Sequence, residues 1–227
     1  IIIKKNNKSG ATGVVIGYDS RHFSFEFAQV TSEVLAAHGI PVYLFRDIAP
    51  TPLISCEIIR RKAIAGIIVT ASHNPPEYNG YKVYWENGGM IVPPEDNQII
   101  EEVQNITRID KIPTISFKKT LQTGIVEWIN CEADDYYLKT VSKLSLGQRE
   151  NNKDLGVIYT PLHGTGGRLV PDLLKQQGFE NVKIVEEQMV PDGDFSTVES
   201  PNPENKHAFK MAVKYASDND DLILAND

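Results

Sequence analysis

The sequence predicts an α/β protein built from two consecutive three-layer α/β domains, whose sheets are mixed but mostly parallel. Short apolar runs alternate with segments of helical period, which is the pattern of strand–helix–strand units. This alternation is interrupted near the middle of the chain and then restarts. A length of 227 residues accommodates one large or two ordinary domains.

The first domain opens with a strand and a helix. Val14-Val15-Ile16-Gly17 is an apolar run closed by a turn residue, as expected for a buried strand. A helix is expected from about Ser24 to His38, with Ser24 as its N-cap and Gly39 just past its end. Its buried stripe is predicted to consist of Phe27, Val30, Val34 and Leu35.

Two more strands are expected in this domain, at residues 41–45 and 66–70. A helix that begins at Pro52 and runs to about Lys62 separates them. Strand, helix, strand, helix and strand at this spacing predict a parallel or mostly parallel sheet with helices on both faces.

The next segment is predicted to be a β-hairpin. Residues 81–85 and 90–92 are β-formers that flank Glu86-Asn87-Gly88-Gly89, and Asn-Gly between β-formers is a strong hairpin signal. We therefore expect an antiparallel edge on the parallel sheet. A helix is expected to start at Pro93-Pro94, which acidic residues follow.

Residues 111–124 show no clean period and are interpreted as the crossover between a first domain, 1–122, and a second domain, 123–227. The second domain repeats the rhythm of the first. Its predicted elements are a helix at 132–144, a loop at 148–154, a strand at 155–160, a helix at 167–177, a strand at 181–185, a Pro-rich loop at 190–203, a helix at 205–217 and a last strand at 222–226.

Both ends of the chain look cut. The chain starts with three isoleucines and stops within a buried-strand pattern that ends in Asp227. A complete domain seldom ends on a central strand. We therefore expect the second domain to be incomplete and the chain to be an N-terminal fragment of a longer protein.

The composition indicates a globular, cytoplasmic protein. The hydrophobic fraction of 41% and charged fraction of 23% exclude wholesale disorder. A net charge of −7 argues against nucleic acid or an anionic membrane as partner, and no apolar stretch is long enough to span a membrane. Two cysteines are too few for a disulfide framework.

The most informative segment is Thr70-Ala71-Ser72-His73-Asn74-Pro75-Pro76. It follows a predicted buried strand, at the edge where open α/β sheets bind their ligands. The Ser72 hydroxyl is a nucleophile if a base or cation stands near it. An ordinary turn started by Asn74-Pro75 explains the same residues equally well.

Lys82 follows on a strand edge after Asn79-Gly80. A lysine at such a site can hold a phosphoryl oxygen or, with a lowered pKa, shuttle a proton. A solvated lysine that blocks edge pairing is the alternative interpretation.

Together these residues form a recognisable pattern. Thr-Ala-Ser-His-Asn-Pro at 70–75, followed by Asn-Gly-Tyr-Lys at 79–82, resembles the active-site serine loop of the α-D-phosphohexomutases, which include phosphoglucomutases, phosphomannomutases and phosphopentomutases. Three other segments resemble motifs of that superfamily in the same order: Gly-Tyr-Asp-Ser-Arg at 17–21, the Leu-His-Gly loop at 160–167 and Pro-Asn-Pro-Glu at 201–204. The Tyr-Trp-Glu-Asn-Gly stretch at 84–88 is most similar to the branch of phosphoglucomutase-2 and phosphopentomutase.

This resemblance implies a reaction. Ser72 would carry a phosphoryl group, donate it to a sugar monophosphate to give a bisphosphate, and take back the other phosphoryl group. Lys82, ten residues later, would be the general acid/base. His73 and Asn74 would orient the serine phosphate or the substrate, and Arg21 would support the same site as a substrate- or phosphate-binding residue. The implied activity is phosphoglucomutase-type transfer between glucose 1-phosphate and glucose 6-phosphate, with mannose or pentose phosphates as alternatives.

The resemblance also implies Mg²⁺, which family members bind through an Asp-x-Asp-x-Asp-Arg loop and an oxygen of the serine phosphate. The last strand would enter that loop, which makes Asp227 the first metal ligand and the phosphate of Ser72 the other. The residues alone support only a terminal aspartate. Glucose 1,6-bisphosphate, or an analogous sugar bisphosphate, is the implied activator.

Other candidate residues have simpler explanations. His163 and its neighbouring glycines could cradle an anion, but a tight strand-to-helix turn is favoured. Asp192-Gly193-Asp194 lacks the further acids of a calcium loop. Cys56 is interpreted as a core filler.

Two other functions compete with the mutase. A non-catalytic sugar-phosphate-binding or regulatory homologue would keep the fold without turnover, although it would not need a nucleophile beside a proton shuttle. A serine hydrolase is disfavoured, because no Gly-x-Ser-x-Gly elbow surrounds Ser72.

Overall fold

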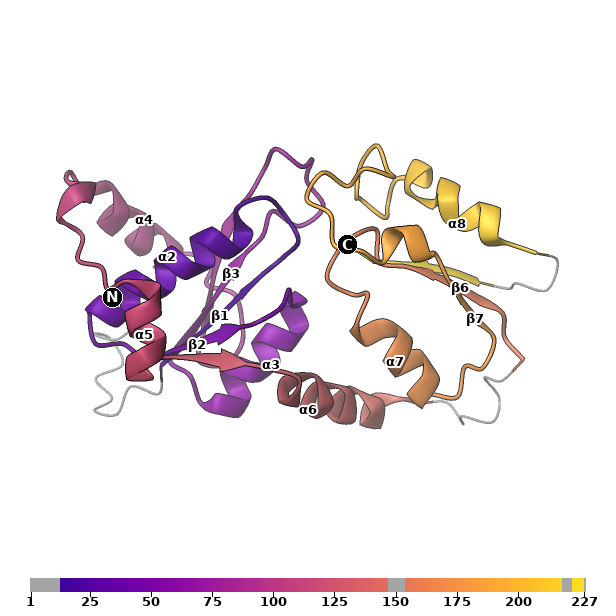
Figure 1. Cartoon of the computed structure of the whole chain (residues 1–227), viewed down its shortest axis with the longest axis horizontal. Helices are drawn as coiled ribbons and strands as arrows, with labels where there is room; N and C mark the ends of the chain where they lie inside the picture. Colours follow the sequence, from indigo (N-terminus) through magenta and orange to yellow (C-terminus); the bar gives the residue numbers. More distant parts are fainter. Residues whose placement is uncertain (1–12, 147–153, 218–221, 227) are drawn as a thin grey trace. The chain divides into compact units, whose positions relative to one another are not determined.

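The computed structural model describes residues 13–146, 154–217 and 222–226 (Figure 1). Asp227 and most of the predicted loop at 148–154 therefore lie outside the described residues. The chain divides into two compact units. The first comprises residues 1–18, 23–70 and 80–130, and the second comprises residues 19–22, 71–79 and 131–227.

Within the described residues, the first unit holds a five-stranded sheet in the order β4-β3-β1-β2-β5. All neighbouring strands are parallel except β4, which is antiparallel to β3. The prediction of a mixed, mostly parallel sheet is confirmed. The strands are β1 (Val14–Tyr18), β2 (Val42–Phe45), β3 (Ala65–Val69), β4 (Tyr81–Trp85) and β5 (Val126–Ile129).

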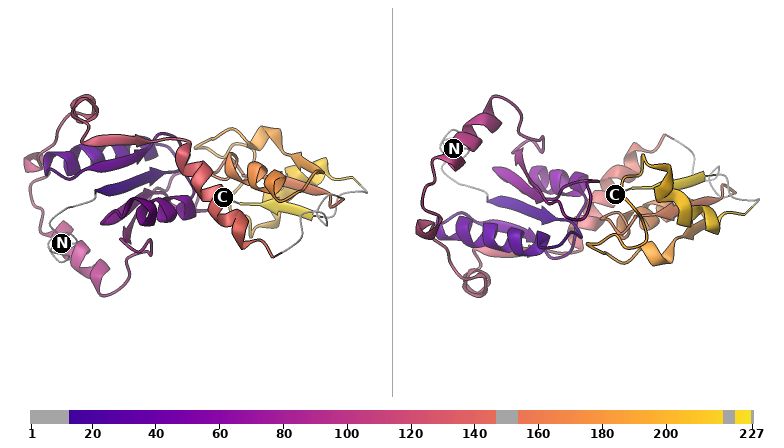
Figure 2. Two further views of the ribbon diagram at one scale, coloured as in Figure 1. Left: turned by 90° about the horizontal axis from the view of Figure 1, so that it is seen from below. Right: turned by 90° about the horizontal axis from the view of Figure 1, so that it is seen from above.

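Four α-helices accompany this sheet in the described part of the unit: α2 (Ser24–Ala37), α3 (Thr51–Arg61), α4 (Glu95–Gln104) and α5 (Phe117–Thr123). Figure 2 shows α2 and α3 on opposite faces of the sheet. This follows from the topology, because the chain moves from β1 to β2 in one direction and returns past β1 to β3 in the other. The predicted three-layer arrangement is confirmed.

The predicted apolar stripe of α2 is wrong in part. Phe27 and Val30 are exposed, at 49% and 51%, whereas the fully buried positions are Ser24, Ala28, Ser32 and Ala36. These small residues recur every fourth position and let the helix approach the sheet closely. The Ser32 hydroxyl satisfies its hydrogen bond within the helix, by donating to the carbonyl of Ala28 at 2.8 Å. The predicted N-cap also differs, because Ser24 is the first helical residue and Phe23 precedes it.

On the other face, α3 packs over two glycines. A Cβ atom on Gly17 of β1 would clash with Cδ1 of Ile54, and one on Gly66 of β3 would clash with Cδ1 of Ile58. Both isoleucines are fully buried. The glycines thus set how close α3 lies to the sheet.

The antiparallel edge is confirmed, but the predicted hairpin is smaller than expected. β4 pairs with β3 along its whole length, with Lys82 opposite Ile68. The second predicted strand, 90–92, is reduced to an isolated bridge between Tyr84 and Met90. Ile91 is buried, but Met90 and Val92 on either side of it are exposed, so one apolar side chain of this segment holds it against the sheet.

The segment interpreted as a crossover, 111–124, contains the helix α5 at residues 117–123. β5 follows it at residues 126–129 and adds to the sheet beside β2. Phe117 and Trp128 pack edge to face against each other at 5.6 Å and lie against the core beside α2. The sheet therefore continues past the predicted boundary at residue 122.

In the second unit, the described residues form a three-stranded parallel sheet in the order β7-β6-β8. The predicted helix at 205–217 is divided into a 3₁₀ turn, Lys206–Phe209, and α8. Ile158, Val185 and Ala212 form the core between α8 and the sheet. The elements are α6 (Glu132–Val141), β6 (Val157–Thr160), α7 (Leu169–Gln176), β7 (Val182–Ile184), α8 (Lys210–Tyr215) and β8 (Leu222–Ala225). Among the helices described, none has the length and apolar character to cross a membrane.

Candidate functional site

The predicted serine loop leaves the sheet at its topological switch point. β1 and β3 are parallel neighbours, and the chain changes direction across the sheet between them. Arg21 follows the carboxyl end of β1, and Ser72 follows the carboxyl end of β3. Open α/β sheets bind ligands at this position, because the loops on either side of the switch point diverge.

Ser72 is exposed and has a left-handed backbone, with φ of 56°. For a residue with a side chain this conformation costs about 1–2 kcal/mol. His73 and Asn74, which the sequence analysis grouped with Ser72, are also exposed. Strained backbone at an exposed hydroxyl is typical of functional loops, where the surrounding structure must hold the residue in place.

Arg21 supplies that support. Its guanidinium Nη1 donates to the carbonyls of Pro75 at 2.8 Å and Tyr78 at 2.9 Å. Its Nη2 donates to the carbonyl of Ser72 at 2.6 Å and also to that of Asn74. Two nitrogen atoms of one side chain thus bind four carbonyls of the serine loop.

The surroundings of Arg21 keep its guanidinium in place. Arg21 is only 4% exposed, and its Nε lies 3.3 Å from Oδ2 of Asp19. Within the same unit, the buried ring of Phe195 stands 5.1 Å from Cζ of Arg21, at cation–π distance. Arg21 is expected from the family resemblance to bind substrate or phosphate, whereas in the structure both of its Nη atoms donate to backbone carbonyls.

Lys82 lies in β4, where it is half-buried and paired in register with Ile68 of β3. The backbone N–H of Thr70 donates to the carbonyl of Gly80 at 3.0 Å, which closes the loop that carries Ser72. The sheet therefore fixes the backbone of Lys82 on the strand that adjoins β3.

The Leu-His-Gly loop after β6 is tied down by a buried polar network. His163 is 3% exposed, and its Nδ1 lies 2.8 Å from the carbonyl oxygen of Val190. Its Nε2 lies 2.8 Å from Oγ1 of Thr197. Because a carbonyl only accepts, we assign the proton to Nδ1, and Nε2 accepts from the Thr197 hydroxyl.

Gln188 completes this network. Its Nε2 donates to Oγ1 of Thr197 at 2.8 Å, and its Oε1 accepts from the hydroxyl of Thr160 at the end of β6. Gln188 is fully buried. Both nitrogens of the His163 ring are thus engaged by the protein, as a tight strand-to-helix turn requires. Thr197 and Gln188 were not among the sequence candidates, since a single hydroxyl or amide has no distinctive spacing.

Asp192 belongs to the Asp-Gly-Asp segment that was rejected as a calcium loop. In the structure its carboxylate organises the loop that contains it. Its carboxylate accepts from the backbone N–H of Ser196 and of Asp194, both at 2.9 Å. The bonds to Ser196, followed by the one to Asp194, lower the pKa of Asp192 to about 2. Phe195 lies within this turn at a φ of 50°.

The predicted metal ligand Asp227 lies outside the described residues, but the strand that leads to it is anchored. Tyr159 of β6 donates its hydroxyl proton to Oδ1 of Asn226 at 2.6 Å, and burial raises the pKa of this phenol. Across the described ranges, no three His, Cys, Asp or Glu side chains gather as a metal site requires.

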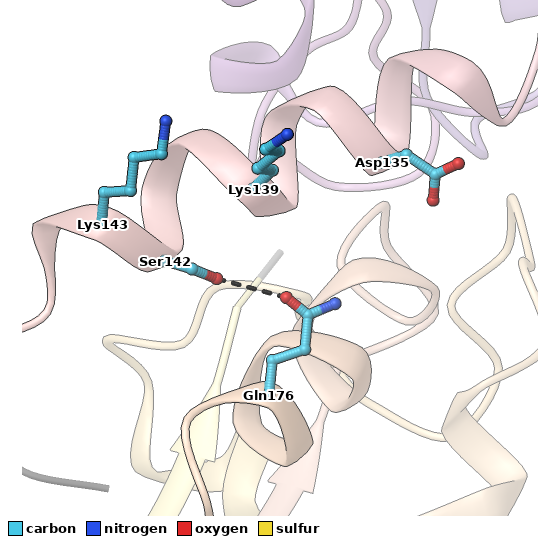
Figure 3. Close-up of a pocket in the computed structure, with 5 residues that line it drawn as sticks. All are labelled: Asp135, Lys139, Ser142, Lys143 and Gln176. Carbon is cyan, nitrogen blue, oxygen red and sulfur yellow. Dashed lines mark hydrogen bonds between the residues drawn. The ribbon is translucent and has the colours of Figure 1, made fainter.

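An open pocket of about 410 Å³ lies between the ends of α6 and α7 (Figure 3). The Ser142 hydroxyl donates to Oε1 of Gln176 at 3.2 Å across it. None of the predicted site residues lines this pocket, whose lining consists of Asp135, Lys139, Ser142, Lys143 and Gln176.

Comparisons with known proteins agree with the motifs. Residues 2–110 match the family model described as phosphoglucomutase/phosphomannomutase, alpha/beta/alpha domain I, and residues 135–227 match the model of domain II. A phosphoglucomutase of Staphylococcus epidermidis is 38% identical over 94% of this chain and 39% of its own length. A probable phosphomannomutase of Haemophilus influenzae is also 38% identical, over 94% of this chain and 43% of its own length.

Solved structures show the same fold. A putative phosphomannomutase from Thermus thermophilus superposes with a TM-score of 0.79 at 24% identity, covering 100% of this chain and 48% of that protein. The phosphoprotein pp63/parafusin, a phosphoglucomutase from Paramecium, gives a TM-score of 0.67 at 20% identity over 91% of this chain and 41% of that protein. The chain thus spans less than half the length of these relatives. With both domain models matched in order, the chain belongs to the phosphoglucomutase/phosphomannomutase family.

Proposed function

We propose that the complete protein carrying this chain is a cytoplasmic isomerase that interconverts glucose 1-phosphate and glucose 6-phosphate through a phosphoserine at Ser72. The observation that carries the proposal is the serine loop. It presents an exposed hydroxyl, in a left-handed backbone, at the switch point of an α/β sheet. Membership of the family supports sugar-phosphate phosphotransfer as the class of reaction.

In the proposed reaction, a sugar hydroxyl attacks the phosphorus of phosphorylated Ser72. The new sugar O–P bond forms as the serine O–P bond breaks, and the hydroxyl proton passes to a base. The resulting sugar bisphosphate reorients and returns its other phosphoryl group to Ser72. Such transfers depend mainly on positioning and on neutralising charge.

Other residues of the loop region take supporting roles in this proposal. Lys82 would act as the acid/base, since its backbone is held on β4 beside the strand that leads to Ser72. His73 and Asn74 are exposed next to Ser72 and can orient the phosphate of the serine or of the sugar. Arg21 supports the loop from its buried position.

Family membership also implies Mg²⁺ dependence. We propose that Asp227 and an oxygen of the Ser72 phosphate contribute to its site, because Asn226, just before Asp227, is held by Tyr159. Hard carboxylate and phosphate oxygens suit this ion. When bound, Mg²⁺ would neutralise charge on the transferring phosphoryl group. Glucose 1,6-bisphosphate would activate the enzyme by charging Ser72.

The test is turnover by the complete protein in the presence of Mg²⁺ and glucose 1,6-bisphosphate, with glucose 1-phosphate as substrate and glucose 6-phosphate measured by a coupled dehydrogenase. Ser72→Ala should abolish turnover, whereas Ser145→Ala, which alters another exposed serine, should leave it unchanged. Full activity of Ser72→Ala would contradict the mechanism. Binding of sugar phosphates without turnover by the unaltered protein would favour the regulatory homologue instead.

The same assay decides the sugar. Mannose 1-phosphate and ribose 1-phosphate would be compared with glucose 1-phosphate by the ratio of kcat/KM, because specificity is a difference in transition-state binding. A higher value for the ribose phosphate would favour the phosphopentomutase branch indicated by residues 84–88.

A further inference from the structure

The serine loop, residues 71–79, contains two consecutive prolines, which reduces the number of N–H groups that can organise its turns. Pro75 and Pro76 have no N–H, so the carbonyls of Asn74 and Pro75 belong to peptides without a donor. Within the loop, the N–H of Asn74 donates to the carbonyl of Ala71 at 3.2 Å, and the N–H of Tyr78 donates to that of Pro75 at 3.1 Å.

Arg21 provides the missing donors. The carbonyls that it binds belong to residues 72, 74, 75 and 78, which spread over almost the whole loop. A guanidinium group can do this because its five N–H groups form a rigid, planar fork, whereas a lysine ammonium offers three donors from one point. One of the four bonds is made to Ser72 itself, directly next to the strained φ angle.

The guanidinium group of Arg21 is itself held in one orientation. Asp19 lies beside Nε, the Phe195 ring lies over the guanidinium, and the side chain is almost fully buried. A buried side chain with four backbone acceptors has little freedom to swing out toward a substrate. This arrangement distinguishes Arg21 from an arginine that binds phosphate directly.

We propose that Arg21 is a positioning residue for phosphoryl transfer. It holds Ser72 in the left-handed conformation and so aims the serine oxygen, without touching the sugar phosphate. The expected effect of Arg21 on kcat rests on the proposed function. Its expected effect on the conformation of the serine loop does not. It predicts that loss of Arg21 slows the chemical step while substrate still binds.

Kinetics of the complete protein test the first consequence. Arg21→Ala should lower kcat by about 100-fold, the order expected when a reacting group is misplaced by about 1 Å, with a KM change of less than about 3-fold. Arg21→Lys should fall between Arg21→Ala and the unaltered protein. Millimolar guanidinium should restore part of the turnover of Arg21→Ala and none of that of Ser72→Ala.

Arg61→Ala is the matched control. Arg61 also has a structural role, because its Nε donates to the buried Glu57 at 2.9 Å and its guanidinium lies 4.7 Å from the ring of Tyr43. Its loss should lower Tm while kcat of the folded protein stays unchanged. If Arg21→Ala does not fold, Arg21→Lys carries the same measurements.

Amide hydrogen exchange tests the second consequence independently of activity. In Arg21→Lys and Arg21→Ala, exchange at residues 71–79 should accelerate while that of β1 and β3 stays the same. Unchanged exchange in the loop, or a kcat that falls only with the folded fraction, would overturn the proposal. If the unaltered protein shows no mutase turnover, the proposed function fails, and the exchange result still decides whether Arg21 holds the loop.

Discussion

The Nε2 atom of His163 lies 2.8 Å from Oγ1 of Thr197, and this hydrogen bond joins the loop after β6 to the Pro-rich loop that precedes α8. The Thr197 hydroxyl donates to His163, and its oxygen also accepts a bond from Nε2 of Gln188 at 2.8 Å. One hydroxyl therefore satisfies two buried side chains that come from different segments. The Pro-rich loop depends on this pair, because it contains little regular structure of its own.

Thr197→Val should destabilise the protein by about 1–3 kcal/mol, since it leaves His163 and Gln188 without their shared partner in a buried site. Urea unfolding measures the change. Thr140→Val is the control, because the Thr140 hydroxyl donates to the Tyr136 carbonyl on the exposed side of α6. This replacement should change stability by less than about 0.5 kcal/mol. Equal losses in the two variants would argue against the network.

The close packing of α3 on the sheet gives a second prediction. Gly66→Ala places a methyl group against Ile58, which is fully buried, and should cost about 1–3 kcal/mol by overpacking. Ile58→Val removes the Cδ1 atom that the new methyl group would meet. In a double-mutant cycle, the double variant should therefore lose less unfolding free energy than the sum of the losses in the two single variants.

Ile59→Val provides the control for this cycle. Ile59 is adjacent in sequence but 58% exposed, and its replacement should not rescue Gly66→Ala. If Ile58→Val and Ile59→Val both restored the stability of Gly66→Ala, the contact with Ile58 would not be the cause of its destabilisation.

The low pKa of Asp192 gives a third prediction. Its pKa in the folded protein, about 2, is below its ordinary value of 3.8, so the carboxylate stabilises the fold at pH above about 4. That contribution is lost as pH falls from about 4 through 2. The free energy of unfolding of Asp192→Asn should be lower than that of the unaltered protein. This difference should be constant near neutral pH and disappear as the pH falls from about 4 to 2.

Asp172→Asn removes one exposed carboxylate from α7 and serves as the charge control for this experiment. If both variants lost the same unfolding free energy with the same pH dependence, the low pKa of Asp192 could not be attributed to its bonds with Ser196 and Asp194.

The role of Lys82 can be separated from simple charge. Lys82→Met should lower kcat by about 10²–10⁴-fold, the range for loss of a general acid/base, while Tm stays nearly unchanged. Lys82→Arg keeps the positive charge but cannot release a proton near neutral pH, so its kcat should stay low. Lys119→Met, at an exposed site on α5, should have no effect. Recovery of turnover in Lys82→Arg would indicate a purely electrostatic role.

Much of the first unit follows from the sequence because its strands are short apolar runs separated by Gly and Pro. The positions of β1, β2, β3, α2 and α3 could be predicted on that basis. The place of Ser72 and Arg21 at the switch point follows in turn, because both residues come directly after neighbouring parallel strands. The local pattern thus locates the site before any contact is known.

Other features depend on contacts that no periodicity records. β5 is a four-residue edge strand, Val-Glu-Trp-Ile, too short to show alternation, and its partner β2 is distant in sequence. The buried face of α2 consists of Ser and Ala, which a search for large apolar residues overlooks. Arg21 binds backbone carbonyls, which every residue possesses. The sequence therefore does not indicate which residues its side chain contacts.

The central claim, that Ser72 carries the phosphoryl group, is tested most directly by locating that group. The complete protein would be incubated with glucose 1,6-bisphosphate and digested with trypsin, which releases residues 63–82 as one peptide. Fragmentation in a mass spectrometer distinguishes Ser72 from Thr70, Tyr78 and Tyr81 in that peptide. The account predicts one phosphoryl group on Ser72 that is transferred on addition of glucose 1-phosphate. An active protein with its phosphoryl group elsewhere, or with none, would contradict it.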